Sequence, residues 1–150
     1  MAIKLQRAKL EELTFEYDDG AKLTIKFDPK NQVFMSKSMQ MYKCLGITSK
    51  DFEKFAKEFE AEIDGDDYEA GLEKVDKVIG AFDACIGNTE TAYKLVDEMF
   101  GTGTAEFFSG GALNPEYLLP LVEALGEKMS EGKAERNNAA AKYIGSEKAQ

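Results

Sequence analysis

The spacing of apolar residues changes once along this 150-residue chain, near Pro29, and this change constrains the fold more than any other feature. Before Pro29 apolar and polar residues alternate, which is typical of a β-strand with one buried face. After it, apolar residues recur every three or four positions, as in amphipathic helices. The sequence therefore predicts an α+β fold that is mainly α, with a β-hairpin at about 12–27 and helices at about 32–130.

The expected hairpin contains two alternating apolar runs, separated by an Asp-Asp-Gly sequence at 18–20. A two-residue loop would place the two apolar sets on opposite faces of the hairpin. A three-residue loop, with Gly20 in the left-handed conformation, pairs Phe15 with Leu23 and leaves one face wholly apolar. We therefore expect the longer loop. Because an isolated hairpin is marginal in water, its apolar face should pack on helices or on another subunit.

The helical part of the sequence is divided by glycines, and a bundle of about five amphipathic helices is expected between them. A helix at about 49–63, with Thr48 or Ser49 as its cap, carries a particularly regular apolar stripe. The expected breaks between helices are at Gly46, at Asp64-Gly65-Asp66, at Gly87-Asn88 and in the glycine-rich segment from Gly101 to Leu113.

The glycine-rich segment is expected to contain a short helical turn, and the start of the last helix has two alternatives. A single helical turn at Ala105–Phe108, capped by Thr104, is expected inside the segment. Asn114 and Pro115 are suited to start the last helix. Because Pro120 lacks an amide hydrogen, this helix either starts near Leu119 or kinks at the proline.

Nothing within residues 12–130 has the composition of a linker, so residues 1–130 are expected to form one domain. Large apolar residues are absent from position 130 until Tyr143. Residues 131–150 are therefore interpreted as a flexible polar tail.

The chain contains no histidine, and this absence restricts its chemistry. Serine and cysteine triads of the usual kind and His-bearing zinc sites all need an imidazole. The two cysteines, Cys44 and Cys85, lie far apart among apolar residues, which favours two reduced core thiols over a disulfide or a metal pair. The composition indicates a non-enzymatic binding or assembly protein.

The net charge of −9 is concentrated in the middle of the chain, where residues 51–100 hold fifteen acidic residues and five lysines. An acidic centre repels phosphate backbones, so nucleic-acid binding is not expected. These acids are interpreted as a solvated helix face, with complementarity to a basic partner as the alternative.

Two segments resemble ligand-binding loops but lack the residues that such loops need. An EF-hand loop starting at Asp64 would place Glu69 at the glycine position and Val75 at the position of the bidentate glutamate. In the segment Gly101–Glu106, no lysine follows the glycines and the glutamate would repel phosphate. Neither a metal nor a cofactor is therefore expected.

Three methionines, Met35, Met39 and Met41, lie close together between Phe34 and Tyr42. Methionine adapts to irregular cores and also recurs on surfaces that bind varied apolar targets. Core filling is the favoured interpretation of this cluster.

The first ten residues contain Lys4, Arg7 and Lys9 and no uninterrupted apolar run, so they do not resemble a signal peptide. No segment approaches the roughly 20 apolar residues of a membrane span. A cytoplasmic location and no membrane contact are expected.

The segment Val96–Leu125 (VDEMFGTGTAEFFSGGALNPEYLLPLVEAL) resembles the tail assembly chaperones of long-tailed bacteriophages and prophages. The resemblance rests on a helix ending in Phe-Gly, followed by Gly-Thr-Ala-Glu, an aromatic pair, Gly-Gly and an amphipathic helix. The matching positions are Phe100-Gly101, Gly103-Thr104-Ala105-Glu106, Phe107-Phe108 and Gly110-Gly111. Pro115 and Pro120 depart from the pattern, which has an uninterrupted helix at this point.

This resemblance implies a chaperone that coats the long, apolar tape measure protein in the host cytoplasm until tail tube subunits polymerise around it. It also implies self-association and a possible contact with the tail tube protein. The alternatives are another tail structural or completion protein, or an unrelated protein-interaction domain. A tube subunit should show more alternating strands than a single hairpin.

Aromatic side chains on the helical stripes are the candidate client-binding residues, because they could cover an apolar client helix. For any one of them, a place in the core is the alternative and the better single expectation. These candidates are Phe52, Phe55, Phe59, Phe100, Phe107 and Phe108.

Overall fold

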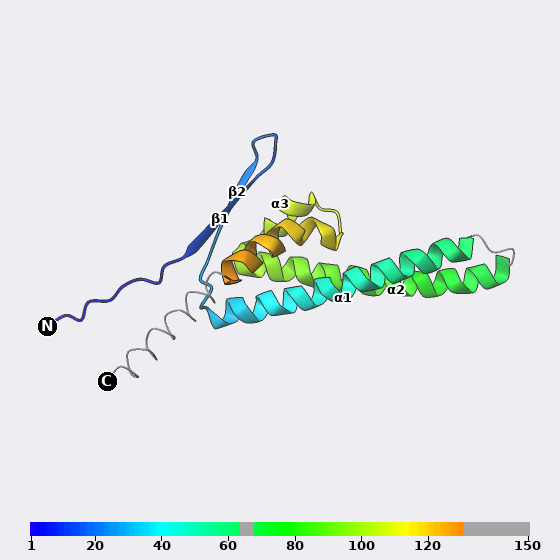
Figure 1. Ribbon diagram of the computed structural model, residues 1–150, viewed down its shortest axis with the longest axis horizontal. Coiled ribbons are helices and arrows are strands. Elements are labelled where there is room, and N and C mark those ends of the chain that lie inside the picture. Colours follow the sequence, from blue (N-terminus) through cyan, green and yellow to red (C-terminus); the bar gives the residue numbers. More distant parts are fainter. Residues whose placement is uncertain (64–67, 131–150) are drawn as a thin grey trace, which may run out of the picture.

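The computed structural model describes residues 1–63 and 68–130, without the side chains at 47–53, 55, 56, 58–63 and 68–70. The elements are β1 (Glu11–Glu16), β2 (Lys22–Phe27), α1 (Gln32–Ile63), α2 (Tyr68–Phe100), α3 (Thr104–Ser109) and a 3-10 helix, η1 (Pro115–Leu118). A further helix covers residues 119–130. The expected N-terminal hairpin and mainly α fold are confirmed (Figure 1). The break expected at 64–66 and the tail expected at 131–150 lie outside the described residues.

The hairpin has the register that the three-residue loop predicts. β1 and β2 are antiparallel, and Phe15 is opposite Leu23. Gly20 has a φ of 93°, the left-handed conformation expected for this loop. The apolar face packs on the helices, where Ile25 is 2 % and Phe27 5 % exposed. The opposite face carries ion pairs between lysines of β2 and glutamates of β1.

Two long helices replace the four shorter ones that the glycines predicted. Gly46 lies inside α1 and Gly87-Asn88 inside α2, so the expected breaks at these positions are wrong. Thr48 and Ser49, expected as caps, also lie inside α1. A glycine in a helix costs only about 1 kcal/mol relative to alanine. The packing of α1 along α2 outweighs this cost, and the two helices run side by side (Figure 1).

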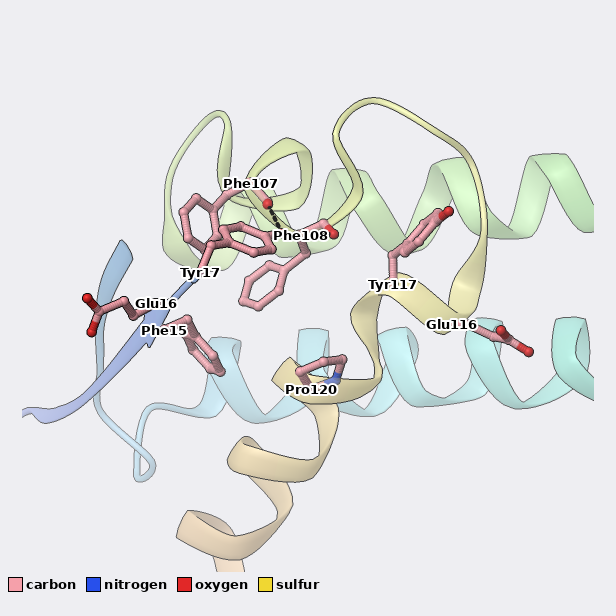
Figure 2. Close-up of a pocket in the computed structure, with 8 residues that line it drawn as sticks. All are labelled: Phe15, Glu16, Tyr17, Phe107, Phe108, Glu116, Tyr117 and Pro120. Carbon is pink, nitrogen blue, oxygen red and sulfur yellow. Dashed lines mark hydrogen bonds between the residues drawn. The ribbon is translucent and has the colours of Figure 1, made fainter. Parts of the chain in front are cut away.

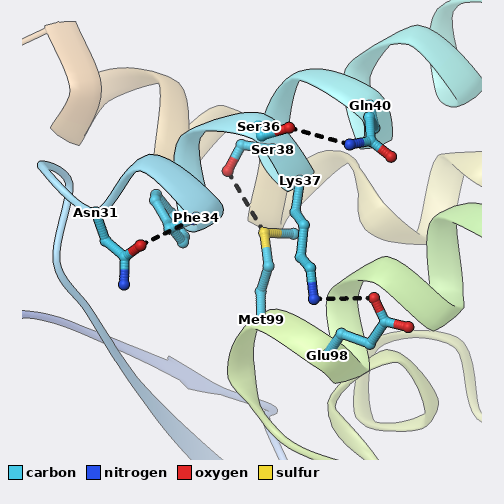
Figure 3. A network of polar contacts seen from close by, with 8 residues as sticks. All are labelled: Asn31, Phe34, Ser36, Lys37, Ser38, Gln40, Glu98 and Met99. Atoms are coloured by element: carbon cyan, nitrogen blue, oxygen red, sulfur yellow. Dashed lines mark hydrogen bonds and ion pairs between the residues drawn. The ribbon is translucent and has the colours of Figure 1, made fainter.

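The start of α1 is fixed by a cap and by contacts with the end of α2 (Figure 3). The side-chain oxygen of Asn31 accepts a hydrogen bond from the backbone amide of Val33 at 2.9 Å. Lys37 forms an ion pair with Glu98 at 3.1 Å, and the buried Ser38 hydroxyl donates to the Met99 sulfur at 3.5 Å. These contacts hold the first turns of α1 against the last turns of α2.

The methionine cluster is divided between core and surface. Met41 is fully buried and Met35 is partly buried, while Met39 is 68 % exposed. Core filling is therefore confirmed for Met41 and wrong for Met39.

Both long helices are amphipathic rather than apolar throughout. Charged residues recur along the whole of α2, including Glu73, Lys77, Asp83, Glu90 and Lys94. No helix in the described part of the chain combines the length and the apolar character that crossing a bilayer requires.

The hydrophobic core lies where the hairpin, the start of α1 and the end of α2 meet the helix at 119–130. The Phe34 ring stacks on Phe27, with centroids 5.0 Å apart, and meets the edge of Phe100 at 5.9 Å. Leu121 and Leu125 of the last helix are fully buried in the same cluster. Of the two cysteines, Cys85 is buried and Cys44 partly buried, and no disulfide joins them.

Tyr42 links α1 to the last helix, and its contact yields a prediction about alkaline pH. Its hydroxyl donates to the backbone carbonyl of Val122 at 3.0 Å, and burial raises the pKa of this hydroxyl above 10.0. As the pH rises past 10, the unfolded chain loses this proton before the folded one, so stability should fall there.

Tyr42→Phe is expected to lower the free energy of unfolding by about 1 kcal/mol at pH 7, because the hydrogen bond is lost. The variant should also lose less stability than the wild type between pH 9 and 11. Urea unfolding across this range measures both effects. An unchanged alkaline slope in the variant would show that another group is responsible.

Candidate functional site

The glycine-rich segment forms a compact turn whose backbone requires glycine. Gly101, Gly103, Gly110 and Gly111 have φ values of 116°, 93°, 63° and 92°, which L-residues with side chains rarely adopt. Two of them flank the expected helical turn, which is confirmed as α3. Thr104 does not cap it: Gly103 occupies the N-cap position, and the Thr104 hydroxyl donates to the Gly101 carbonyl at 2.7 Å.

The turn is joined to α2 by side chains of that helix. A carboxylate oxygen of Asp97 accepts from the Ala105 backbone amide at 2.9 Å. The Tyr93 hydroxyl lies 2.7 Å from the Ala112 carbonyl and 3.0 Å from that of Asn114, and accepts from the Asn114 amide at 3.2 Å. The Tyr93 hydroxyl has a single proton, so it donates to either the Ala112 carbonyl or the Asn114 carbonyl at any one time. The four-glycine pattern is therefore held as one unit with the end of α2.

The last helix starts at residue 119, which is one of the two alternatives expected from Pro120. The side chain of Asn114 caps η1 by accepting from the Glu116 amide at 3.0 Å, and Pro115 occupies the first turn. Residue 119 starts the following helix, so Pro120 lies in its first turn, where a missing amide hydrogen costs little.

An open pocket of about 360 Å³ lies between the end of β1, α3 and the segment from η1 to Pro120 (Figure 2). We call it the aromatic pocket. Five aromatic rings and a proline line most of it, together with two glutamates. These lining residues are Phe15, Glu16, Tyr17, Phe107, Phe108, Glu116, Tyr117 and Pro120.

Edge-on and tilted ring contacts hold one wall of the aromatic pocket. The Phe15 and Phe108 rings are 4.9 Å apart in an edge-on arrangement, and Tyr17 and Phe107 are 4.9 Å apart and tilted. The Tyr17 hydroxyl donates to the backbone carbonyl of Phe107. This bond joins the tip of the hairpin to α3 and positions the Tyr17 ring, so the pocket wall is preorganised.

The charged residues that line the aromatic pocket are two exposed glutamates, Glu16 and Glu116. Glu16 forms an ion pair with Lys22 of β2 at 3.7 Å, and Lys22 itself does not line the pocket. Tyr17 and Tyr117 are each 44 % exposed, so part of the aromatic surface faces solvent. An apolar cavity beside two carboxylates suits an apolar side chain next to a basic one. The lining residues include no serine, cysteine or lysine nucleophile.

The structure brings together two of the six aromatic residues predicted to bind a client. Phe107 and Phe108 line the aromatic pocket, although Phe108 is only 9 % exposed. Phe100 lies instead in the core against Phe27 and Phe34. The side chains of Phe52, Phe55 and Phe59 lie outside the described residues.

Sequence reasoning missed six of the eight lining residues: four aromatic or proline residues and the two glutamates. Phe15 and Tyr17 could have been found, because both belong to the apolar face of the hairpin, which had to pack on another element. No sequence signal pointed to Tyr117, since the 3-10 turn that presents it was not expected, or placed Pro120 beside the hairpin.

Within the described part of the chain, no three side chains of the His, Cys, Asp and Glu types come together in a way that could hold a metal ion. Comparison of the chain with protein-family models, with curated proteins and with solved structures found no match.

Proposed function

We propose that this chain is a non-enzymatic tail assembly chaperone of a long-tailed bacteriophage or prophage, acting in the host cytoplasm. In this proposal it binds apolar segments of the tape measure protein and holds that protein in solution during tail assembly. The observation that carries the proposal is the aromatic pocket. The segment that resembles the chaperone family supplies Phe107 and Phe108 to its lining, and glycines of the same segment flank the short helix that carries this pair.

The pocket supplies a physical mechanism for holding an apolar client. An aliphatic or aromatic client side chain placed against Phe107 and Tyr117 would remove apolar surface from water on both partners. Glu116 would pair with a neighbouring lysine or arginine of the client. The chain's net charge of −9 would then keep complexes apart by repulsion.

Two parts of the proposal rest on the resemblance alone. These are the self-association of the chaperone and its contact with the tail tube protein. The hairpin does not offer its apolar face for self-association, because that face is packed on the helices of the same chain.

Co-expression with a candidate tape measure protein tests the proposal. The tape measure protein should be insoluble alone and should become soluble and co-purify when this chain is present. If it stays insoluble, or stays soluble without binding, another tail role or an unrelated interaction domain becomes the better account.

Tyr117→Ser is expected to weaken client binding at least tenfold, because it removes an exposed ring from the pocket without opening the core. A tenfold loss corresponds to about 1.4 kcal/mol, less than burying a large apolar side chain contributes. Met39→Ser is the matched control, because Met39 is a 68 % exposed apolar residue on α1 and does not line the pocket. Isothermal titration with a client fragment measures the affinities, and equal binding by the two variants would place the client elsewhere.

A further inference from the structure

The first ten residues, which we call the arm, run away from the helices as an extended segment (Figure 1). All ten are exposed, and none belongs to a helix or a strand. Ile3 and Leu5 are 87 % and 88 % exposed, more than any other large apolar residue of the described chain except Met1. Neighbouring exposed aliphatic side chains are typical of a surface that binds another molecule.

The arm combines aliphatic and basic side chains along one face. Side chains of an extended segment alternate between two faces, so Ile3, Leu5 and Arg7 lie on the same face at intervals of about 7 Å. Lys9 continues this face, and the arm contains no acidic residue. The arm therefore offers two aliphatic side chains followed by two cations.

The aromatic pocket has the surface that such a segment needs (Figure 2). A cavity of about 150 Å³ holds a benzene-sized group, so the pocket of about 360 Å³ has room for two aliphatic side chains. Glu116 lies beside Tyr117 in the lining, and none of the ion pairs in the described part of the chain involves this glutamate. Its carboxylate is therefore available to a cation of the bound segment.

The arm leaves β1 at the end that is farther from the pocket. Phe15 and Tyr17 line the pocket at the end of β1, whereas the arm joins the start of β1 at Glu11 (Figure 1). To enter the pocket of its own chain, the arm would have to reverse and run back along the six residues of β1, about 20 Å. The arm contains no glycine, proline, asparagine, aspartate or serine, which are the residues that favour such a turn. A second copy can insert its arm without this reversal.

We propose that the arm of one copy docks in the aromatic pocket of a second copy. Ile3 and Leu5 enter between the aromatic rings, and Arg7 pairs with Glu116. Arm and pocket are different surfaces of the chain, so every copy offers one of each. The inference does not depend on the proposed chaperone function, although a docked arm and an apolar client would exclude each other from the pocket.

A labelled peptide with the sequence of the arm, MAIKLQRAKL, tests the docking. The receptor is the full-length chain with Ile3→Ser and Leu5→Ser, called the arm variant, whose pocket is not filled by its own arm. Fluorescence anisotropy is expected to show binding of the peptide to the arm variant. A peptide with the same two serines should bind at least tenfold more weakly. A peptide with Ala2→Ser and Gln6→Ser is the matched control and should keep its affinity, because these residues lie on the opposite face.

Changes in the receptor locate the bound peptide. Adding Glu116→Lys and Tyr117→Ser to the arm variant should weaken binding of the arm peptide at least tenfold, because both exposed residues line the pocket. Adding Met39→Ser should leave the affinity unchanged, since Met39 is exposed on α1 and does not line the pocket. Circular dichroism confirms that each variant keeps its helical content.

Mixing two variants tests whether the arm docks on a second copy. The pocket variant carries Glu116→Lys and Tyr117→Ser and keeps its arm, whereas the arm variant keeps its pocket. In sedimentation velocity the wild type should associate as its concentration rises, and each variant alone should associate at least tenfold more weakly. A mixture of the two variants should form mixed pairs, because an intact arm then meets an intact pocket.

Four outcomes would overturn the inference. The arm peptide could fail to bind the arm variant. The serine peptide could bind as well as the arm peptide, which would indicate non-specific attraction of a basic peptide to an acidic chain. The pocket changes could leave peptide binding unaltered, which would place the arm elsewhere, such as the free edge of β1. The wild type could also remain a monomer and exclude the peptide that the arm variant binds, which would place the arm in the pocket of its own chain.

Discussion

Replacing Phe34 with alanine is expected to lower the free energy of unfolding by about 3–5 kcal/mol. Phe34 is 6 % exposed, stacks on Phe27 and contacts Phe100, so its removal leaves a cavity where the hairpin joins both long helices. Domains of this size are typically stable by only about 5–15 kcal/mol. The variant should therefore be close to unfolding at 37 °C, and urea denaturation followed by circular dichroism measures the loss.

The preceding residue supplies the control for this prediction. Val33 is 61 % exposed on the same turn of α1, so Val33→Ala should change the stability by less than about 0.5 kcal/mol. If Phe34→Ala cost less than 1 kcal/mol, the three-ring cluster would not be the junction of the hairpin and the helices.

Local patterns predicted the hairpin correctly because its register has only one solution that buries a single apolar face. Opposing Phe15 to Leu23 required a glycine at the third loop position, and Gly20 is there with a positive φ. The start of the last helix near residue 119 was predictable for a similar reason, since the missing amide hydrogen of Pro120 limits where the helix can begin.

The breaks expected at Gly46 and Gly87 were wrong because a glycine has a different effect at a helix end than inside a helix. At a helix end a glycine adopts positive φ easily, while within a helix it costs about 1 kcal/mol. The choice depends on whether the helix on both sides of the glycine is held by a neighbour. In this chain α1 and α2 support each other across both positions, and that long-range contact is not visible in the sequence.

The candidate site could be predicted only in part, because it is assembled from segments distant in the sequence. The glycine pattern and the Phe107-Phe108 pair were recognisable within one segment. Their contact with Phe15 and Tyr17 depends on how the hairpin folds onto α3, about ninety residues away in the chain. Periodicity alone also gives no sign of which apolar residues on a long helix are covered by a neighbour.

Substitutions at Gly87 should separate a continuous α2 from two helices that meet there. A Cβ at Gly87 would meet nothing within 4 Å, so Gly87→Ala is expected to raise the free energy of unfolding by up to about 1 kcal/mol. Gly87→Pro should lower it by about 3 kcal/mol or more, because proline removes a helical hydrogen bond and clashes with the carbonyl of residue 83. Thermal and urea unfolding of both variants measure these shifts.

Gly20 is the matched control, because it also has open space around the added Cβ but a φ of 93°. Gly20→Ala should therefore destabilise the protein by roughly 1 kcal/mol, the opposite sign from Gly87→Ala. The added Cβ has open space at both Gly20 and Gly87. A difference in the sign of the two stability changes therefore reports the backbone conformation alone. If Gly87→Ala were destabilising and Gly87→Pro tolerated, α2 would end near residue 87 and a second helix would start after it.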